Sequence, residues 1–97
     1  MSFYLNVIDN TKSTISTIWT LHLPYSLYDV DQKYELDWKH YHGKPCKEVD
    51  QLLTNKLKQL LKLQETSYNS DINDVIHRVI NIRDHMYYYD QYMLSVI

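Results

Sequence analysis

Two long stretches of helically spaced apolar residues most constrain what this chain can fold into. Residues 46–64 place leucine and valine at intervals of three and four, opposite lysine and glutamine. Residues 72–97 follow a heptad, and a heptad of this length favours one continuous helix that can join a coiled coil. The break at 65–70 therefore predicts an antiparallel αα-hairpin over 45–97. The heptad positions are Ile72, Val75, Val79, Ile82, Met86, Tyr89, Met93 and Val96.

The first part of the chain, residues 1–42, is rich in strand signals. Residues 3–8 are mostly β-branched or aromatic, and residues 14–23 alternate with the period of a strand, except at Ile18. The polar run between these two segments predicts that they pair as an antiparallel hairpin.

A third strand is predicted over residues 33–39, where charged and apolar side chains alternate. A helix is the competing interpretation, because apolar residues also recur there at helical spacing. The whole chain, 1–97, is thus expected to form one α+β domain: an antiparallel β-meander of about three short strands, followed by the αα-hairpin. The alternative is a mostly α-helical small subunit.

The amino-acid composition excludes several kinds of phosphate-binding and catalytic site. The chain has a single glycine and no alanine, so it cannot build a phosphate-binding loop, a dinucleotide fingerprint or a nucleophile elbow, which need several glycines. Isoleucine, asparagine, lysine and tyrosine are abundant instead, as expected of an AT-rich genome. With one cysteine, no long apolar run and no signal-like start, we expect an intracellular protein, cytoplasmic or nuclear, or in the host cell if the protein is viral.

The C-terminal pattern carries apolar and aromatic residues on more than one face, and the first helix can cover only one of them. The remaining surface must face either the sheet or another chain. Tyrosine favours interfaces because it combines a large contact area with a polar tip. The predicted partner-binding residues are Met86, Tyr87, Tyr88, Tyr92, Met93 and Ile97.

The charges are uneven along the chain. Residues 38–64 hold six lysines and two acids, whereas residues 65–97 hold five acids and two arginines, so the two helices would attract each other. Alternatively, the lysines bind phosphate while Tyr34, Trp38 and Tyr41 stack bases on a strand face. A net charge of −2 argues against that partner. The lysines concerned are Lys39, Lys44, Lys47, Lys58 and Lys62.

His40, His42 and Cys46 lie close together in the sequence, as metal ligands or a nucleophile and its base could. The spacing matches no standard zinc signature, and Cys46 also fits the first helix as a small buried residue. We therefore expect no metal, no cofactor, no small-molecule substrate and no enzymatic activity.

These observations together predict a non-enzymatic protein–protein interaction module, or a small subunit of a multiprotein complex, that binds through its C-terminal amphipathic helix. The partner is another protein or a second copy of the chain. Two alternatives stay open: a viral or phage inhibitor or regulator that binds a host protein, and a nucleic-acid-binding module that uses the lysine-rich stretch 39–62.

Overall fold

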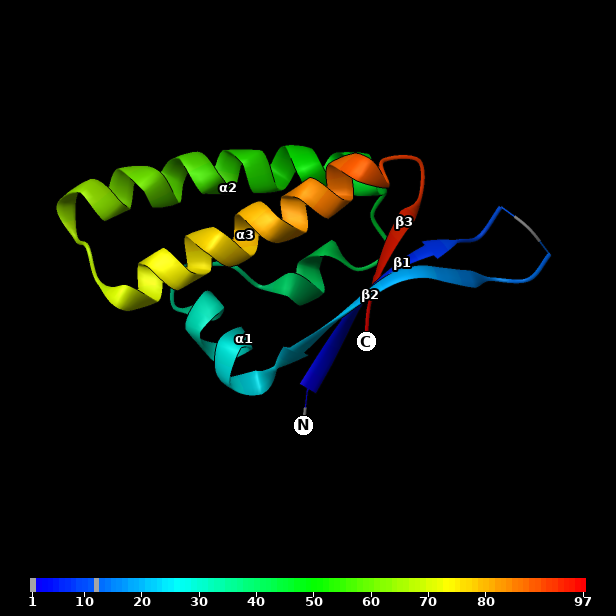
Figure 1. The fold of residues 1–97 in the computed structure, drawn as a ribbon, viewed down its shortest axis with the longest axis horizontal. Helices are drawn as coiled ribbons and strands as arrows, with labels where there is room; N and C mark the ends of the chain where they lie inside the picture. Colours follow the sequence, from blue (N-terminus) through cyan, green and yellow to red (C-terminus); the bar gives the residue numbers. More distant parts are fainter. Residues whose placement is uncertain (1, 12) are drawn as a thin grey trace.

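The computed structural model describes residues 2–11 and 13–97 as a three-stranded antiparallel sheet with helices packed on one face (Figure 1). The predicted α+β class is confirmed, and the mostly helical alternative is not needed. In chain order the elements are β1 (Ser2–Asp9), β2 (Ser16–Pro24), α1 (Tyr25–Gln32), the 3₁₀ helix η1 (Trp38–Tyr41), α2 (Cys46–Thr66), α3 (Ser70–Tyr88) and β3 (Met93–Val96).

The predicted N-terminal hairpin is confirmed, since β1 and β2 pair antiparallel along their length. The register shifts once: Val7 lies opposite Trp19, but the next residue, Ile8, lies opposite Thr17. Ile18 is therefore an extra residue that forms a β-bulge. The bulge explains why Ile18 breaks the alternation of its strand.

Residues 33–39 do not form the predicted third strand. They leave α1 through a turn in which Glu35 has φ 60° and the Leu36 N–H donates to the Asp31 carbonyl at 3.2 Å. This six-to-one hydrogen bond is typical of a Schellman helix end. Leu36 and Trp38 are fully buried, so the charged–apolar alternation reflects burial of two loop side chains rather than strand pairing.

The first predicted helix is confirmed as α2. Its buried stripe faces the rest of the fold and consists of Cys46, Val49, Leu53 and Leu60. Helix α3 begins at a cap in which the Asn69 side chain accepts a hydrogen bond from the Ile72 N–H at 2.9 Å. Figure 1 shows the two helices side by side and antiparallel, as an αα-hairpin requires.

The prediction of one continuous helix over 72–97 is wrong. Helix α3 ends at Tyr88, and the chain turns back to form β3, which pairs antiparallel with β1 in a sheet of order β2-β1-β3. Leu94 and Val96 are buried at a spacing of two, which suits a strand packed on one face. Pairing with β1 buries these residues and satisfies the backbone of both strands, which a longer helix could not do for β1.

The heptad positions pack inside the fold and not against a second chain. The first five positions are fully buried, and they are Ile72, Val75, Val79, Ile82 and Met86. They pack in one core cluster with side chains from the sheet, α2 and the loop around η1. Within residues 2–11 and 13–97, no helix has the length and apolar character that crossing a bilayer requires.

Candidate protein-binding surface

The structure separates the six residues predicted to bind a partner. Met86 is fully buried and Tyr92 packs partly buried against the core, so neither offers much contact surface. Tyr87 and Tyr88 are 73% and 76% exposed at the end of α3. The other two, Met93 and Ile97, belong to the sheet, at and directly after β3.

The outer face of the sheet is the side that carries no helix. In β1, Phe3, Leu5 and Val7 point to the buried side, so the residues between them point outward. Pairing then decides their neighbours on β2 and β3. The outer face consists of Tyr4 between His22 and Ile97, Asn6 between Thr20 and Ser95, and Ile8 between Thr17 and Met93.

This outer face carries no formal charge. Across the three strands Asp9 is the single Asp, Glu, Lys or Arg, and its side chain is buried on the opposite side of β1. By contrast, the whole chain has ten basic and twelve acidic residues. An exposed surface that lacks charges while its surroundings are rich in them resembles the centre of a protein interface.

The polar side chains on the outer face interact with one another. The Thr20 hydroxyl donates to Asn6 Oδ1 at 2.5 Å, and the ring of Tyr4 lies 5.2 Å from the ring of His22. At one end, Tyr4 is 46% and Ile97 is 68% exposed. A partner placed here would remove apolar surface from water without stripping water from a charge.

A buried polar network ties the loop after α1 to α3. Asp31 is fully buried and accepts hydrogen bonds from Trp38 Nε1 at 2.7 Å and from Arg78 Nε at 3.1 Å. Each oxygen of the carboxylate thus has a partner, and the Arg78 side chain is itself 15% exposed. Sequence reasoning missed this network because its members lie 47 residues apart along the chain.

A second polar pair joins α1 to the start of η1. The Tyr28 hydroxyl donates to Asp37 Oδ1 at 2.5 Å. Burial, and then this hydrogen bond, raises the pKa of Tyr28 to about 12. For Asp37, burial raises the pKa, but hydrogen bonds from Tyr28 and from the Lys39 N–H outweigh it and lower the pKa overall. At neutral pH the phenol stays protonated and the carboxylate ionised, and both pKa values move away from the range that acid–base catalysis uses.

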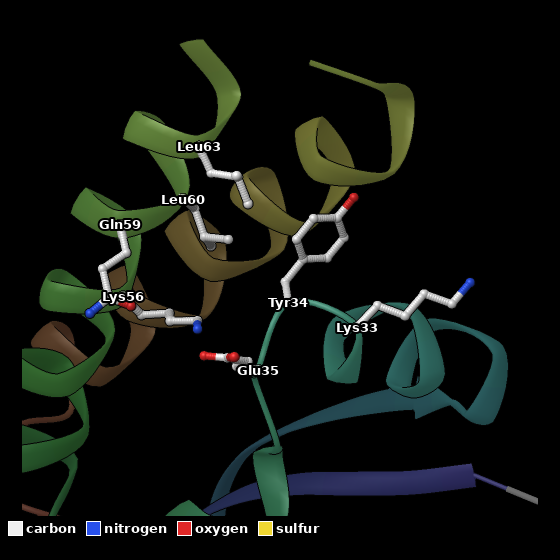
Figure 2. Close-up of a pocket in the computed structure, with 7 residues that line it drawn as sticks. All are labelled: Lys33, Tyr34, Glu35, Lys56, Gln59, Leu60 and Leu63. Atoms are coloured by element: carbon white, nitrogen blue, oxygen red, sulfur yellow. The ribbon is translucent and has the colours of Figure 1, made fainter. Parts of the chain in front are cut away.

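Two open grooves flank α2. The first, of about 300 Å³, lies between the loop after α1 and the second half of α2 (Figure 2). Figure 2 shows the side chains of Glu35 and Lys56 approaching each other across it, while Lys33 extends away. The second, of about 340 Å³, lies between α2 and α3 and is lined by Asp50, Thr54, Arg83, Asp84 and Tyr87. Charges of both signs line both grooves, so neither matches the largely apolar lining of a small-molecule site.

The aromatic face predicted for nucleic acid does not form. Trp38 is fully buried, and the Tyr34 hydroxyl donates to Asn69 Oδ1 at 3.1 Å beside the first groove. The ammonium group of Lys39 lies 4.6 Å from the centroid of the Phe3 ring. The remaining lysines lie on or just before α2: Lys44, paired with Glu48 at 3.5 Å, and the exposed Lys47, Lys58 and Lys62.

The histidines and the cysteine of this candidate metal site make other contacts or are buried. His42 Nδ1 accepts a hydrogen bond from the Val96 N–H at 2.9 Å, and His40 lies 3.7 Å from Asp37. Among residues 2–11 and 13–97, no three His, Cys, Asp or Glu side chains gather as a metal site requires. Cys46 is fully buried, and burial raises the pKa of its thiol to about 11. A reactive cysteine needs the opposite shift.

Comparison with known protein families, curated proteins and solved structures finds no match to this chain.

Proposed function

We propose that this protein is a non-enzymatic interaction module, a small subunit that docks another protein against the outer face of its sheet. The observation that carries the proposal is the absence of charge from that face. Interface centres are depleted in charged residues and enriched in tyrosine and methionine, and Tyr4 and Met93 lie on this face. The proposal keeps two of the residues predicted from the sequence, Met93 and Ile97, and adds Tyr4 and Ile8.

The partner should present an uncharged surface rich in aliphatic or aromatic side chains. A charged partner would have to give up its hydration without gaining an opposite charge on the sheet. The sheet face itself covers on the order of 300–400 Å², from the usual strand spacing and rise per residue. That is about half of the roughly 800 Å² per partner in a standard stable complex, so a partner must also reach neighbouring elements or a second sheet.

The lack of catalytic chemistry is part of the same proposal. The pKa values of Tyr28, Asp37 and Cys46 all shift away from neutrality. Together with the charged linings of both grooves, these shifts support a binding role over a catalytic one.

The test is to place charges on the outer face and measure what the protein captures. Tagged wild-type protein and the double variant Tyr4→Lys/Ile97→Lys would be used to capture proteins from the native host, with identification by mass spectrometry. The matched control is Tyr68→Lys, because Tyr68 is 67% exposed but lies in the α2–α3 connection. Far-UV circular dichroism would confirm that all three proteins are folded.

We expect the double variant to lose the partner and the Tyr68→Lys protein to keep it. The reason is that buried charges at an interface centre cost several kcal/mol when no opposite charge compensates them. Equal capture by all three proteins would show that the sheet face is not the docking surface.

A further inference from the structure

The sheet has two edges, and the chain covers only one of them. At the β3 edge, on the side of the strand away from β1, the Gly43 N–H donates to the Leu94 carbonyl at 2.8 Å. The Leu94 N–H donates to the Lys44 carbonyl at 3.0 Å. The Cys46 N–H bonds the Tyr92 carbonyl at 2.9 Å in the same way. β2 forms the other edge and pairs with β1 alone among the strands of residues 2–11 and 13–97.

The β2 edge lacks the protection against pairing that charged side chains give. Natural edge strands carry lysine or other charges, proline or bulges that discourage another strand from adding to them. β2 spans nine residues, Ser16–Pro24, and contains no Asp, Glu, Lys or Arg. Its bulge at Ile18 and its final proline leave a regular, uncharged run between them, Trp19–Leu23.

The backbone direction in this run follows from β1. Both the N–H and the C=O of Tyr4 bond Ile97, at 2.7 and 3.0 Å, so they point toward β3. The residue opposite Tyr4 on β2, His22, must then direct its own N–H and C=O away from β1. Thr20, two residues earlier and opposite Asn6, does the same. These two exposed residues present backbone donors and acceptors along the open edge.

We propose that two copies of this chain pair antiparallel through the β2 edge, about a two-fold axis at Leu21, and form one six-stranded sheet. In this register Thr20 of each copy exchanges both backbone hydrogen bonds with His22 of the other. Leu21 of one copy lies directly opposite Leu21 of the other, on the side of the sheet that faces the helices.

Neighbouring registers fit less well. An axis at Thr20 would set the bulged residue Ile18 opposite His22 and disrupt the ladder. An axis at His22 would set Pro24 opposite Thr20, and proline has no N–H to donate. The Leu21 register sets Ile18 opposite Pro24, so both irregular positions fall outside the paired run Trp19–Leu23.

A second copy suits this edge better than a charged strand of another protein. In a symmetric antiparallel pair, each side chain meets a side chain of the same short segment, so any charge on the strand would face like charges nearby. β2 has none, and its helix-side residues Trp19, Leu21 and Leu23 would extend one another's apolar surface. Pairing would also double the uncharged outer face to on the order of 700 Å², close to the roughly 800 Å² per partner of a standard interface. Only this last consequence rests on the proposed function.

The first measurement uses the unmodified chain. Light scattering coupled to size exclusion, over a range of protein concentrations, should give twice the mass of one chain. A single-chain mass at all concentrations up to about 100 µM, well above the Kd of a typical specific dimer, would overturn the proposal.

Cysteine pairs then test the register. Leu21→Cys should form a disulfide-linked dimer under mild oxidation, because opposed Cα atoms in such a ladder lie about 4.5 Å apart, within disulfide range. Thr20→Cys and His22→Cys should each fail alone but should cross-link when mixed, because these positions oppose each other. Cys46 is buried and does not compete. Cross-linking of Thr20→Cys with itself, or none by Leu21→Cys, would overturn the register.

Charge substitutions provide a separate check. Leu21→Lys and Leu21→Glu should each be monomeric, and an equimolar mixture of the two should dimerise, which a misfolded variant could not do. The capture experiment distinguishes this inference from the proposed function. A monomer whose partner binding depends on Tyr4 and Ile97 would overturn only the dimer, whereas a dimer that captures no partner would overturn only the docking role.

Discussion

Replacing Arg78 with methionine should destabilise the protein far more than the same change at Arg83 on the same helix. Arg78 binds both carboxylate oxygens of Asp31, which has no exposed surface. Methionine preserves the aliphatic stem but removes the guanidinium group. Asp31 would then retain, of the hydrogen bonds described, only the one from Trp38 Nε1 at 2.7 Å.

The magnitude follows from burial. Removing one partner of a buried ion pair costs about 3–5 kcal/mol, because the remaining charge stays away from water without compensation. A chain of this length is typically stable by about 5–15 kcal/mol, so Arg78→Met removes a large share. Arg83 pairs with Asp84 at 3.7 Å, and the two side chains are 32% and 65% exposed. Such a surface pair is worth about 0–1 kcal/mol.

Urea unfolding followed by far-UV circular dichroism would measure the free energy of unfolding for the wild type and both variants. A third protein, Asp31→Asn/Arg78→Met, should recover most of the loss, because no unpaired charge remains in the core and the amide oxygen can still accept the hydrogen bond from Trp38 Nε1. If Arg78→Met and Arg83→Met each cost less than about 1 kcal/mol, Asp31 is not held as a buried charge and the reasoning fails.

Three further predictions concern Cys46, two backbone positions and the end of α3. Because burial raises the pKa of Cys46 from 9.0 to about 11, its contribution to stability is fully present below pH 9 and is lost as the pH rises through 11. In urea titrations from pH 8 to 11 the wild type should lose about 2–3 kcal/mol more than Cys46→Ala, because the raised pKa of Tyr28 affects both proteins alike, and equal losses would contradict the assignment. Gly43 has φ 78° with no atom within 4 Å of an added Cβ, so Gly43→Ala should cost about 1 kcal/mol through backbone strain alone. Glu35→Gly, at φ 60°, should gain about 0.5–1 kcal/mol, and thermal unfolding that shifts in the same direction for both variants would refute the strain argument. Tyr87→Ser/Tyr88→Ser should change stability by less than about 0.5 kcal/mol because both side chains are exposed, and altered capture of partners by this variant would extend the binding surface to the end of α3.

Local periodicity predicted the elements whose partners lie nearby in the sequence. The α2 stripe and the β1–β2 hairpin are confirmed, since side chains a few residues apart decide which face is buried. Even the exception at Ile18 was visible as a break in alternation, although the bulge that causes it was not. The alternation over 33–39 misled because a Schellman turn at Glu35 and the burial of Trp38 reproduce it without a strand.

The candidate surface was predicted only in part. Met93 and Ile97 were selected as residues of a helix, whereas they belong to the sheet and its extension. Tyr4 and Ile8 were not selected, because only the pairing of β1 with β3 shows that all four share one face. The sequence does show that the strand segments have almost no charged residues, and this signal could have indicated the surface.

The sequence by itself determined the α+β class, the hairpin, the α2 helix and the lack of glycine-dependent phosphate sites, because each depends on residues close in the chain or on composition. The tertiary structure decided where α3 ends, which segment became the third strand and which face of the sheet stayed bare. Leu94 can pair with Val7 only after α2 and α3 have folded back and brought the C-terminus beside β1. The pattern of residues around Leu94 cannot indicate pairing with β1, because β1 lies almost the whole chain away in sequence.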